Sequence, residues 1–578
     1  MASKKRAFIQ EYGADNAIVF ANDDVQGYRR INIEDNRPKR DKNSTNFKKI
    51  KKSKLSELVA LQTKEIQQEV SSDSGNELDD EQIEMDATDL YLQTFVDFTS
   101  KVHATTKTTL GKYTVETNAI EFMTTSCHLS PNITIPKELN ESGQLVWQSV
   151  STYKDTYFSD WKWCDSEMYR SILVTHVANH LLKTLSVKKI NNLKLRANPD
   201  FECRDQGFSK CSVLYVCPLK NSAKDFVDEL ISVLSFYKVK KYERFSQLYG
   251  ALDDYDEDAE LDDFCATFRG NVEDNFAMGI KFNKYGIQLL STLDKSDIII
   301  CSPSAMKANE NIDMILSSVE IAIFDQPVDL LFQNWENVEY IINNMNLVPK
   351  STSSNDIMRI KEHFLDGNGS RARQTIMMSS HLFPRLNSLY RESNTLNGKV
   401  KISAKQTNKL QKGISQLFVP FFTSSLQQVS EDRFIYFKKH IVNQISDNTI
   451  IIVPHYHDFV KLRNWMDIEN KDFEELDEYT DISDVNRVRN MFIDGKIKFL
   501  LFSERLWYYK RSPIKGVENI LFYAPPETHK GYKQFIRWPG VKKVTMLYCQ
   551  YDYLALERIF GSVKIKSVIK EMKYMQFN

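Results

Sequence analysis

The stretch SDIIICSPSAMKANENIDMILSSVEIAIFDQPVDLLFQNWE, residues 296–336, contains two short apolar runs, at 297–301 and 319–324. Both runs are rich in β-branched residues, which is typical of buried strands. The residues between them, 305–316, predict a helix or a partly helical crossover. Two buried strands joined by a dozen or more residues indicate a parallel sheet. Binding and catalytic sites lie at the carboxyl ends of the strands in such sheets. The pair Asp325-Gln326, at the end of the second run, is therefore a position where functional residues are expected.

Similar apolar runs alternate with helical patterns along most of the chain, which favours an α/β fold in two successive domains. We expect a tail at 1–88, an N-terminal segment at 89–165 without an assigned topology over 104–160, a first domain at 166–395 and a second at 396–578. The further predicted strands are 212–217, 375–380, 449–454, 498–503, 519–523 and 544–549. The predicted helices are one starting near 89, then 167–185, 222–237 with Ser222 as its N-cap, 457–466, 484–493 and 553–560.

The first 88 residues combine a basic block at 37–54 with an acidic block at 64–89. Few large apolar groups are available there to offset the entropy of ordering, so we predict a disordered tail. The basic block is also typical of a nuclear address or a polyanion contact. A second acidic run, at 253–263, predicts an exposed loop.

Composition excludes several other classes of protein. The chain has 578 residues, 42% of them apolar, and its eight cysteines form no CxxC pair, so we expect reduced thiols and no zinc ribbon. No apolar run reaches the roughly 18 residues that a membrane span needs, and the N-terminus lacks an apolar signal core. We expect an intracellular soluble protein without a membrane partner.

The chain is built like an ATP-driven motor but lacks the residues for the reaction. A motor needs a glycine-rich phosphate loop, yet GxxxxGK[ST] is absent and no glycine occurs between Gly143 and Gly207. It also needs an acidic pair, and Gln326 cannot accept a proton as a glutamate would. No arginine-rich HRxGRxxR run follows residue 500. We therefore predict no catalytic residue, no enzyme activity and no bound cofactor, with Asp325 and Gln326 as the degenerate remnant of that acidic pair.

His176 and His180 lie four residues apart on a predicted helix, as metal ligands do in some proteases. The position of the catalytic glutamate is taken by Val177, and no third ligand can be identified. Packed or solvent-facing histidines are the better interpretation, so we predict no metal site. No GxSxG elbow for a hydrolase is present either.

With these catalytic sites excluded, the cationic and aromatic residues of the second half of the chain indicate a binding function. The run SERLWYYKR at 503–511 follows a predicted strand, and KLRNW at 461–465 and NRVRN at 486–490 add further cations. Guanidinium groups with nearby aromatic rings suit single-stranded RNA. The alternative is that the aromatic rings belong to the core and the charges to a solvated face. The candidate RNA-binding residues are Arg463, Arg487, Arg489, Arg505, Lys510 and Arg511.

Several blocks in order resemble the U3 small nucleolar RNA-associated protein 25 family. They are RDQGF, PLKNSA, SDIIICSP, FDQPVDLLFQNWE, SSH, VPHYHDFVKLRNW, SERLWYYKR with IKGVENILFYAPP, and YDYLALERIFG, and they extend over about 86–578. The resemblance implies two tandem RecA-like domains, similar to those of DEAD-box (P-loop) helicases, with degenerate catalytic motifs. This chain departs from the family's Asp-Gln-Ala-Asp in reading Asp325-Gln326-Pro327-Val328, which further weakens any claim for metal binding.

The resemblance also implies a nuclear, nucleolar component of the small-subunit processome that acts in 18S ribosomal RNA maturation and 40S ribosome biogenesis. The expected partners are processome proteins, the U3 ribonucleoprotein and pre-ribosomal RNA, with a helicase-like scaffold role. Two alternatives stay open. One is an active ATP-dependent RNA helicase, and the other is a module that binds only proteins.

Overall fold

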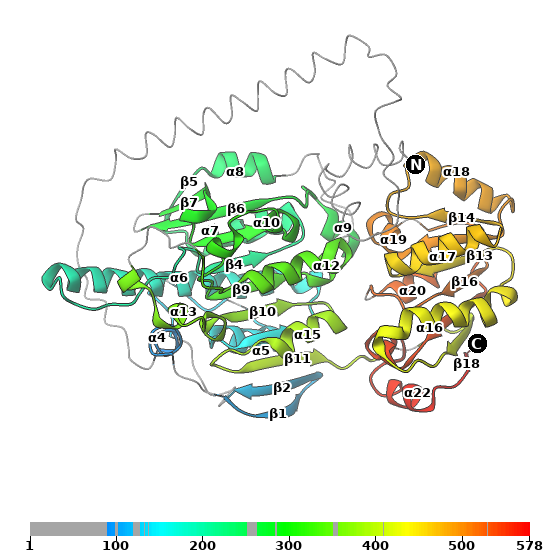
Figure 1. Ribbon diagram of the computed structural model, residues 1–578, viewed down its shortest axis with the longest axis horizontal. Coiled ribbons are helices and arrows are strands. Elements are labelled where there is room, and N and C mark those ends of the chain that lie inside the picture. Colours follow the sequence, from blue (N-terminus) through cyan, green and yellow to red (C-terminus); the bar gives the residue numbers. More distant parts are fainter. Residues whose placement is uncertain are drawn as a thin grey trace, which may run out of the picture. The chain divides into compact units, whose positions relative to one another are not determined.

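The computed structural model describes residues 89–98, 102–119, 128–131, 133–136, 138–250, 263–283, 286–350, 357–408, 410–511, 513–528 and 530–577. The tail predicted at 1–88 lies outside the described residues, as does all but the last residue of the acidic run at 253–263. Residues 86–578 form one compact unit whose core consists of two β-sheets with helices packed on them (Figure 1). The predicted α/β class is confirmed.

The first sheet contains eleven strands among the described residues, in the order β1-β2-β11-β3-β10-β9-β4-β8-β6-β7-β5. Its centre, from β11 to β8, is parallel, and β1, β2 and β6 add antiparallel pairs at its sides. The strands are β1 Val102–Leu110, β2 Tyr113–Ala119, β3 Asp155–Phe158, β4 Val213–Val216, β5 Lys238–Lys240, β6 Ala277–Asn283, β7 Gly286–Ser291, β8 Ile298–Cys301, β9 Ile321–Asp325, β10 Gln374–Met378 and β11 Lys399–Ala404.

Alternating side chains of the central strands enter two different cores, as the two-residue period of a strand requires. Leu214 and Val216 of β4 join a cluster with residues of α10, α11, α12 and α15. Tyr215, between them in sequence, stacks on Phe226 of α7 instead. The helices are α4 Leu90–Phe95, α5 Glu141–Ser151, α6 Ser166–Ala197, α7 Lys220–Val233, α8 Tyr242–Tyr249, α9 Asp263–Phe268, α10 Pro303–Lys307, α11 Ile312–Ile315, α12 Pro327–Asn344, α13 Glu362–Leu365, α14 Gly369–Ala372 and α15 Pro384–Glu392.

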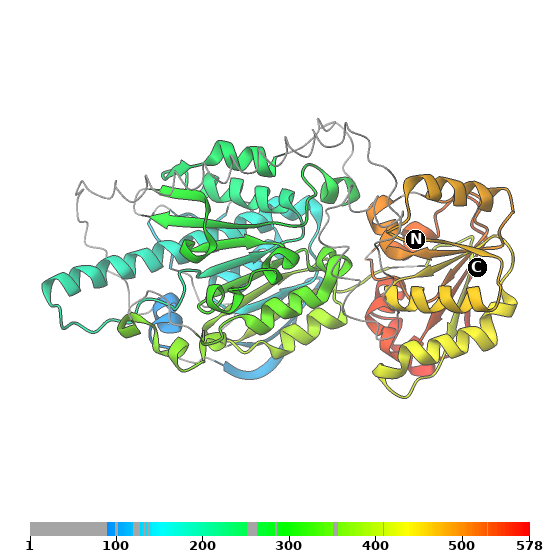
Figure 2. The same ribbon diagram turned by 45° about the horizontal axis from the view of Figure 1, so that its top comes forward.

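Helix α6 is the longest described helix packed on the first sheet, and its last turns extend past the edge of that sheet (Figures 1 and 2). Its buried residues run from Tyr169 to Thr184, whereas the turns after them are partly or fully exposed. In the part of the chain that is described, no helix is both long and apolar enough to cross a membrane.

The second sheet has seven strands within the described ranges, in the order β14-β15-β13-β16-β17-β12-β18, all parallel except β18. The strands are β12 Ser415–Pro420, β13 Thr449–Val453, β14 Phe473–Leu476, β15 Phe499–Ser503, β16 Asn519–Phe522, β17 Lys543–Tyr548 and β18 Met575–Phe577. The helices are α16 Val429–Tyr436, α17 Tyr456–Ile468, α18 Ile482–Ile493, α19 Glu504–Lys510, α20 Gly531–Phe535, α21 Tyr553–Phe560 and α22 Ile565–Glu571, with a π-helical turn at Phe437–Ile441.

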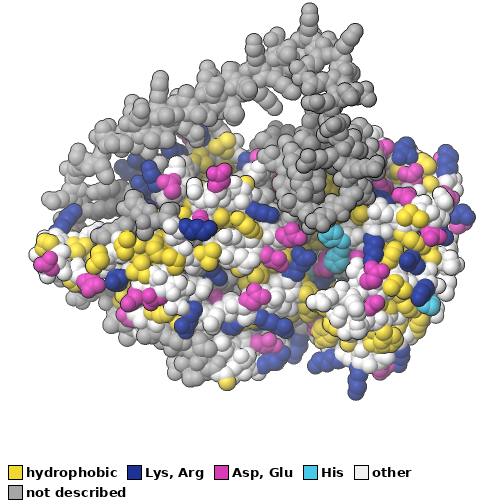
Figure 3. Space-filling view, viewed as in Figure 1, with side chains coloured by type: hydrophobic (Ala, Val, Ile, Leu, Met, Phe, Trp, Pro, Cys, Tyr) yellow, Lys and Arg dark blue, Asp and Glu magenta, His cyan; other side chains and the backbone are white. Residues whose placement is uncertain are grey.

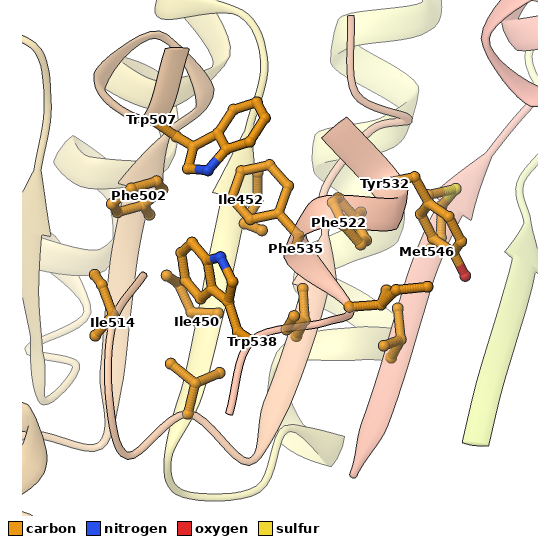
Figure 4. Close-up of a cluster of buried hydrophobic side chains, with 14 of the residues drawn as sticks. Ile450, Ile452, Phe502, Trp507, Ile514, Phe522, Tyr532, Phe535, Trp538 and Met546 are labelled. Carbon is orange, nitrogen blue, oxygen red and sulfur yellow. The ribbon is translucent and has the colours of Figure 1, made fainter. Parts of the chain in front are cut away.

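Two cores cover the faces of this sheet. One joins β-strand residues to α16, the π-helical turn and α17. The other joins them to α18–α22 and is rich in aromatic rings (Figure 4). Phe535 of α20 lies at the centre of the second core, with ring centroids 4.6 Å from Trp507 and 5.1 Å from Trp538. Large rings in such a core supply most of the apolar area that stabilises the domain.

The segment 305–316 is a partly helical crossover, one of the two forms expected for it: it forms two short helices, α10 and α11, because the Ser302 hydroxyl caps the first at Ala305 and an Asn-Glu-Asn turn separates the two. Two local predictions were wrong in detail. Helix α7 begins at Lys220, two residues before the expected cap Ser222. The helix expected at 167–185 continues to Ala197. The other predicted strands and helices are present. Strands β3 and β11 of the first sheet lie outside 166–395, the range expected for the first domain, and this domain boundary stays a prediction.

Candidate functional site

The parallel strands β3, β10, β9 and β4 end at one edge of the first sheet, which we call the carboxyl edge. Four segments follow these strand ends and lie at this edge. They are 159–165 after β3, 379–383 after β10, Gln326-Pro327 after β9 and 217–219 after β4. In an open α/β sheet this is the position of a ligand site.

The carboxylate of Asp325 is hydrogen-bonded to another side chain of the protein. The hydroxyl of Tyr215 donates a hydrogen bond of 2.6 Å to Oδ2 of Asp325, and both side chains are buried. The ring of Tyr215 is held by Phe226, with centroids 4.1 Å apart. Burial raises the pKa of Asp325 and raises that of Tyr215 well above its usual value. Oδ2 of Asp325 is thus committed to the phenol, and burial of the carboxylate opposes its use as a metal ligand.

The following residue, Gln326, does not supply the missing base. Its backbone is left-handed, with φ of 50°, and it leads into α12, whose first residue is Pro327. Its side-chain Nε2 donates to the hydroxyl of Ser222 at 3.3 Å. An amide held in this way orients the loop but cannot take a proton from water.

The segment between β3 and α6 has the strand–loop–helix arrangement of a phosphate loop, but it contains SDWKWCD at 159–165. The amide of Trp161 donates to the carbonyl of Ser379 at 3.1 Å, so it is not available to a ligand. The rings of Trp161 and Trp163 meet edge to face at 4.8 Å. Asp165 and Glu167 lie at the N-terminus of α6, where they repel a phosphate. The loop is therefore unsuited to cradle a nucleotide.

Acidic partners hold most of the candidate RNA-binding arginines. Arg463 of α17 pairs with Glu475 at 3.5 Å, and Arg487 of α18 pairs with Glu474 at 3.7 Å. Arg505 pairs with Glu478 at 3.2 Å and donates to the carbonyl of Gln333 at 3.1 Å. The run FEELDE at 473–478 thus supplies the partner of three arginines. Figure 3 shows the same mixing of cationic and acidic side chains over the described part of one face.

The remaining candidates differ in exposure. Arg511 is half-buried, with its guanidinium 4.0 Å from the ring centroid of Trp507 and Nη1 donating to Oε1 of Gln534 at 2.6 Å. Burial lowers the pKa of Arg489. Lys510 is exposed, and the side chain of Arg487 keeps 49% of its surface accessible. Lys510 and Arg487 are therefore the candidates that an RNA strand could reach most directly.

The aromatic rings of the same run are packed. Trp507 belongs to the core of the second sheet. Tyr508 stacks on Phe332 of α12, with centroids 4.4 Å apart, and its hydroxyl donates to Asp329. Burial raises the pKa of Asp329 to about 7. Tyr508 thereby joins α19 to α12, and neither Trp507 nor Tyr508 is available to stack on bases.

The two helix histidines are packed as well. His176 Nε2 lies 2.7 Å from Oε1 of Gln374, and His180 Nε2 lies 2.9 Å from Oε2 of Glu320. Burial lowers the pKa of both rings, that of His176 to about 3. Among the described residues no group of three or more His, Cys, Asp or Glu side chains could hold a metal ion.

Two mostly parallel sheets follow one another along the chain, each with helices packed on its faces, and define an α/β protein of two successive sheets. Family models match residues 153–400, as the UTP25 NTP hydrolase-like domain, and residues 406–577, as the Utp25 C-terminal domain. The chain is 30% identical over 464 residues to the U3 small nucleolar RNA-associated protein 25 of Schizosaccharomyces pombe, with 75% of this chain and 71% of the relative covered. It is 32% identical over 447 residues to that of Schizosaccharomyces japonicus, with 73% and 70% covered. The chain belongs to the U3 small nucleolar RNA-associated protein 25 family.

Solved structures with a similar course of the chain include a DEAD box protein from Methanococcus jannaschii, at 11% identity and a TM-score of 0.23, with 74% of this chain and 90% of that chain covered. The yeast DEAD-box splicing factor Prp28 matches at 11% identity and a TM-score of 0.26, with 73% and 83% covered.

Proposed function

We propose that this protein is a non-catalytic, helicase-like component of the nucleolar small-subunit processome. It acts in U3-dependent processing of pre-ribosomal RNA, in 18S RNA maturation and in 40S ribosome biogenesis, as a scaffold for RNA and protein. Its partners are processome proteins, the U3 ribonucleoprotein and pre-ribosomal RNA, in the nucleolus. The names of the family's curated members support the assignment to ribosome biogenesis.

One observation carries the non-catalytic part of the proposal. The carboxylate at the position of the helicase acidic pair, Asp325, accepts the phenol of Tyr215 inside the core. The phosphate-loop position, occupied by Trp161 and Trp163 without a glycine, agrees with this. A helicase domain without these groups can still present its two sheets and their surfaces to partners.

The test replaces the native protein by Asp325→Asn in cells depleted of it. Asparagine keeps an oxygen that accepts the Tyr215 hydroxyl but removes the charge that a motor needs. We expect depletion alone to cause early 18S precursors to accumulate, and Asp325→Asn to restore processing as fully as the native chain. Northern blots of precursors measure this, with the exposed Asp366→Asn as the matched control.

Two results would contradict the proposal. Unchanged 18S processing after depletion would remove the assignment to the processome. RNA-stimulated ATP hydrolysis that Asp325→Asn abolishes would establish the alternative, an active helicase.

Direct RNA contact is a further part of the proposal, with Arg463, Arg487, Arg489, Arg505, Lys510 and Arg511 as its candidates. Exposure favours Lys510 and Arg487 among them. We expect the double variant Lys510→Glu/Arg487→Glu to bind single-stranded pre-18S RNA more weakly. The slope of log affinity against log salt concentration should also become shallower, by about one to two.

Filter binding at several salt concentrations measures this slope, and crosslinking of the tagged protein in cells locates the contact near residues 461–511. The exposed Lys566→Glu on α22 is the control for a change of net charge. Equal affinity of the double variant and the native chain for naked RNA would favour the module that binds only proteins.

A further inference from the structure

A cavity of about 420 Å³ lies in the second domain, where residues 407–411 meet α20 and α21. Three cationic side chains line it, those of Lys533, Arg537 and Arg558, and none of its described lining residues is acidic. None of its lining residues belongs to the carboxyl edge of the first sheet, although Arg558 also contacts that edge at the carbonyl of Leu382.

Among the described residues none of these three cations forms an ion pair with a carboxylate at contact distance. The guanidinium of Arg558 is 6% exposed and donates to main-chain carbonyls, those of Pro526 at 2.8 Å, Glu527 at 3.2 Å and Leu382 at 3.4 Å. Lys533 Nζ donates to Oδ1 of Asn408. Arg537 is exposed, and within the described residues no carboxylate pairs with any of the three.

Like charges lie close together in this lining. Burial, and then the charges of Arg537 and Lys530, lower the pKa of Lys533. Burial also lowers the pKa of Arg558, although the charges of Glu527, Glu504 and Glu557 outside the lining oppose that shift. An anionic ligand would add a countercharge inside the cavity, where three cationic side chains face it.

Part of the cavity lining is apolar. Pro526, Ile536, Ala555 and Ile559 contribute it, and Ile536 and Ile559 also belong to the core of the second sheet. The volume lies in the range of small-molecule sites, roughly 300–1,000 Å³. A lining with both cationic and apolar side chains fits a molecule with a charged phosphate and a carbon skeleton or ring.

We propose that this cavity binds a phosphorylated ligand of nucleotide size, with the phosphate on Lys533, Arg537 and Arg558 and the ring or sugar against Pro526 and Ile559. The same chemistry is available from a free nucleotide and from the terminal nucleotide of an RNA strand. The proposal goes beyond the scaffold function and does not depend on it.

The test is isothermal titration of the full-length protein with three probes. They are AMP, a 5′-phosphorylated tetraribonucleotide and the same tetranucleotide with a 5′-hydroxyl. We expect saturable binding of AMP if the source is a free nucleotide, or of the phosphorylated strand over the hydroxyl strand if the source is an RNA end.

The double variant Lys533→Gln/Arg537→Gln weakens that binding at least about tenfold, because each lost charge-assisted bond lowers affinity. Both side chains are at least partly exposed, so the variant keeps the fold, which circular dichroism checks. The exposed Lys566→Gln is the matched control, and Asp325→Asn, at the other site, leaves the affinity unchanged. Absence of saturable binding for every probe up to about 1 mM, or equal affinity in the double variant, would overturn the proposal.

Discussion

Replacing Lys361 by methionine is expected to lower the free energy of unfolding by about 3–5 kcal/mol. Lys361 Nζ lies 2.5 Å from Oε1 of Glu320, and both side chains are almost completely buried. The other carboxylate oxygen of Glu320 faces His180, whose pKa is lowered by burial, so that ring stays neutral. Without Lys361 the carboxylate of Glu320 stays in the core without a countercharge, and that uncompensated charge causes the loss.

The cluster also joins segments that are distant in the sequence. Lys361 precedes α13, Glu320 precedes β9, and His180 lies in the middle of α6. The ammonium group of Lys361 also lies 5.6 Å from the ring centroid of Phe95 in α4. Loss of this residue therefore affects several contacts around the first sheet at once.

Urea denaturation of the full chain, followed by tryptophan fluorescence, measures the change in the transition of the first domain. The control is Lys542→Met, which removes a surface pair with Glu518 and is expected to cost under about 1 kcal/mol. The double variant Lys361→Met/Glu320→Leu is expected to recover much of the loss, because an apolar pair replaces a buried ionic one. A single-variant loss as small as that of the control would mean that Glu320 is not isolated from water.

His176 is expected to make the first domain sensitive to acid. Its Nε2 faces Oε1 of Gln374, and its Nδ1 is buried without a hydrogen-bond partner. The neutral ring fits this site as a donor at Nε2, whereas a protonated ring would bury a second N–H without an acceptor. Burial accordingly lowers the pKa from 6.5 to about 3.

A group whose pKa is depressed by folding contributes stability above its unfolded pKa, and that stability is lost as the pH falls towards the folded pKa. Between pH 7 and pH 4 this loss amounts to about 3 kcal/mol for His176. The variant His176→Gln does not titrate, so its stability relative to the native chain should improve by that amount between pH 7 and pH 4.

Denaturation of both proteins at several pH values measures the difference, in which the titrations of all other groups cancel. The exposed His457→Gln serves as the control for replacing a histidine by glutamine. A difference that stays constant from pH 7 to pH 4 would show that the ring of His176 is protonated without cost in the folded protein.

The apolar runs predicted most central strands of both sheets, because a strand buried on both faces is usually apolar along its length. The runs at 297–301 and 319–324 became β8 and β9. They are not neighbours, since β4 lies between them in the sheet. Strand order depends on how the crossover helices pack, and that is not visible in local sequence. The short strand β3 was missed for a related reason, because DTYF at 155–158 contains two polar residues that the fold buries.

The candidate site was predictable mainly through what it lacks. The glycine-free interval from 144 to 206 contains the loop after β3, and Gln326 follows Asp325 at the end of β9. The partners of these residues were not predictable. Tyr215 resembled any other strand residue, yet the pairing of β4 with β9 brings it to Asp325. The acidic run at 473–478 gave no sign that it would pair with Arg463, Arg487 and Arg505.

The sequence by itself therefore determined the α/β class, the positions of most central strands of the two sheets and of several helices, and the absence of a glycine phosphate loop and of a second acid beside Asp325. These features depend on residue type and local spacing, which a single chain displays directly. Only the tertiary structure showed that the hydroxyl of Tyr215 is hydrogen-bonded to Asp325 and that glutamates of the run 473–478 form ion pairs with three of the candidate arginines. It also showed that Lys533, Arg537 and Arg558 line one cavity. Each of these depends on side chains that are far apart along the chain, and only packing of the sheets brings them within contact distance.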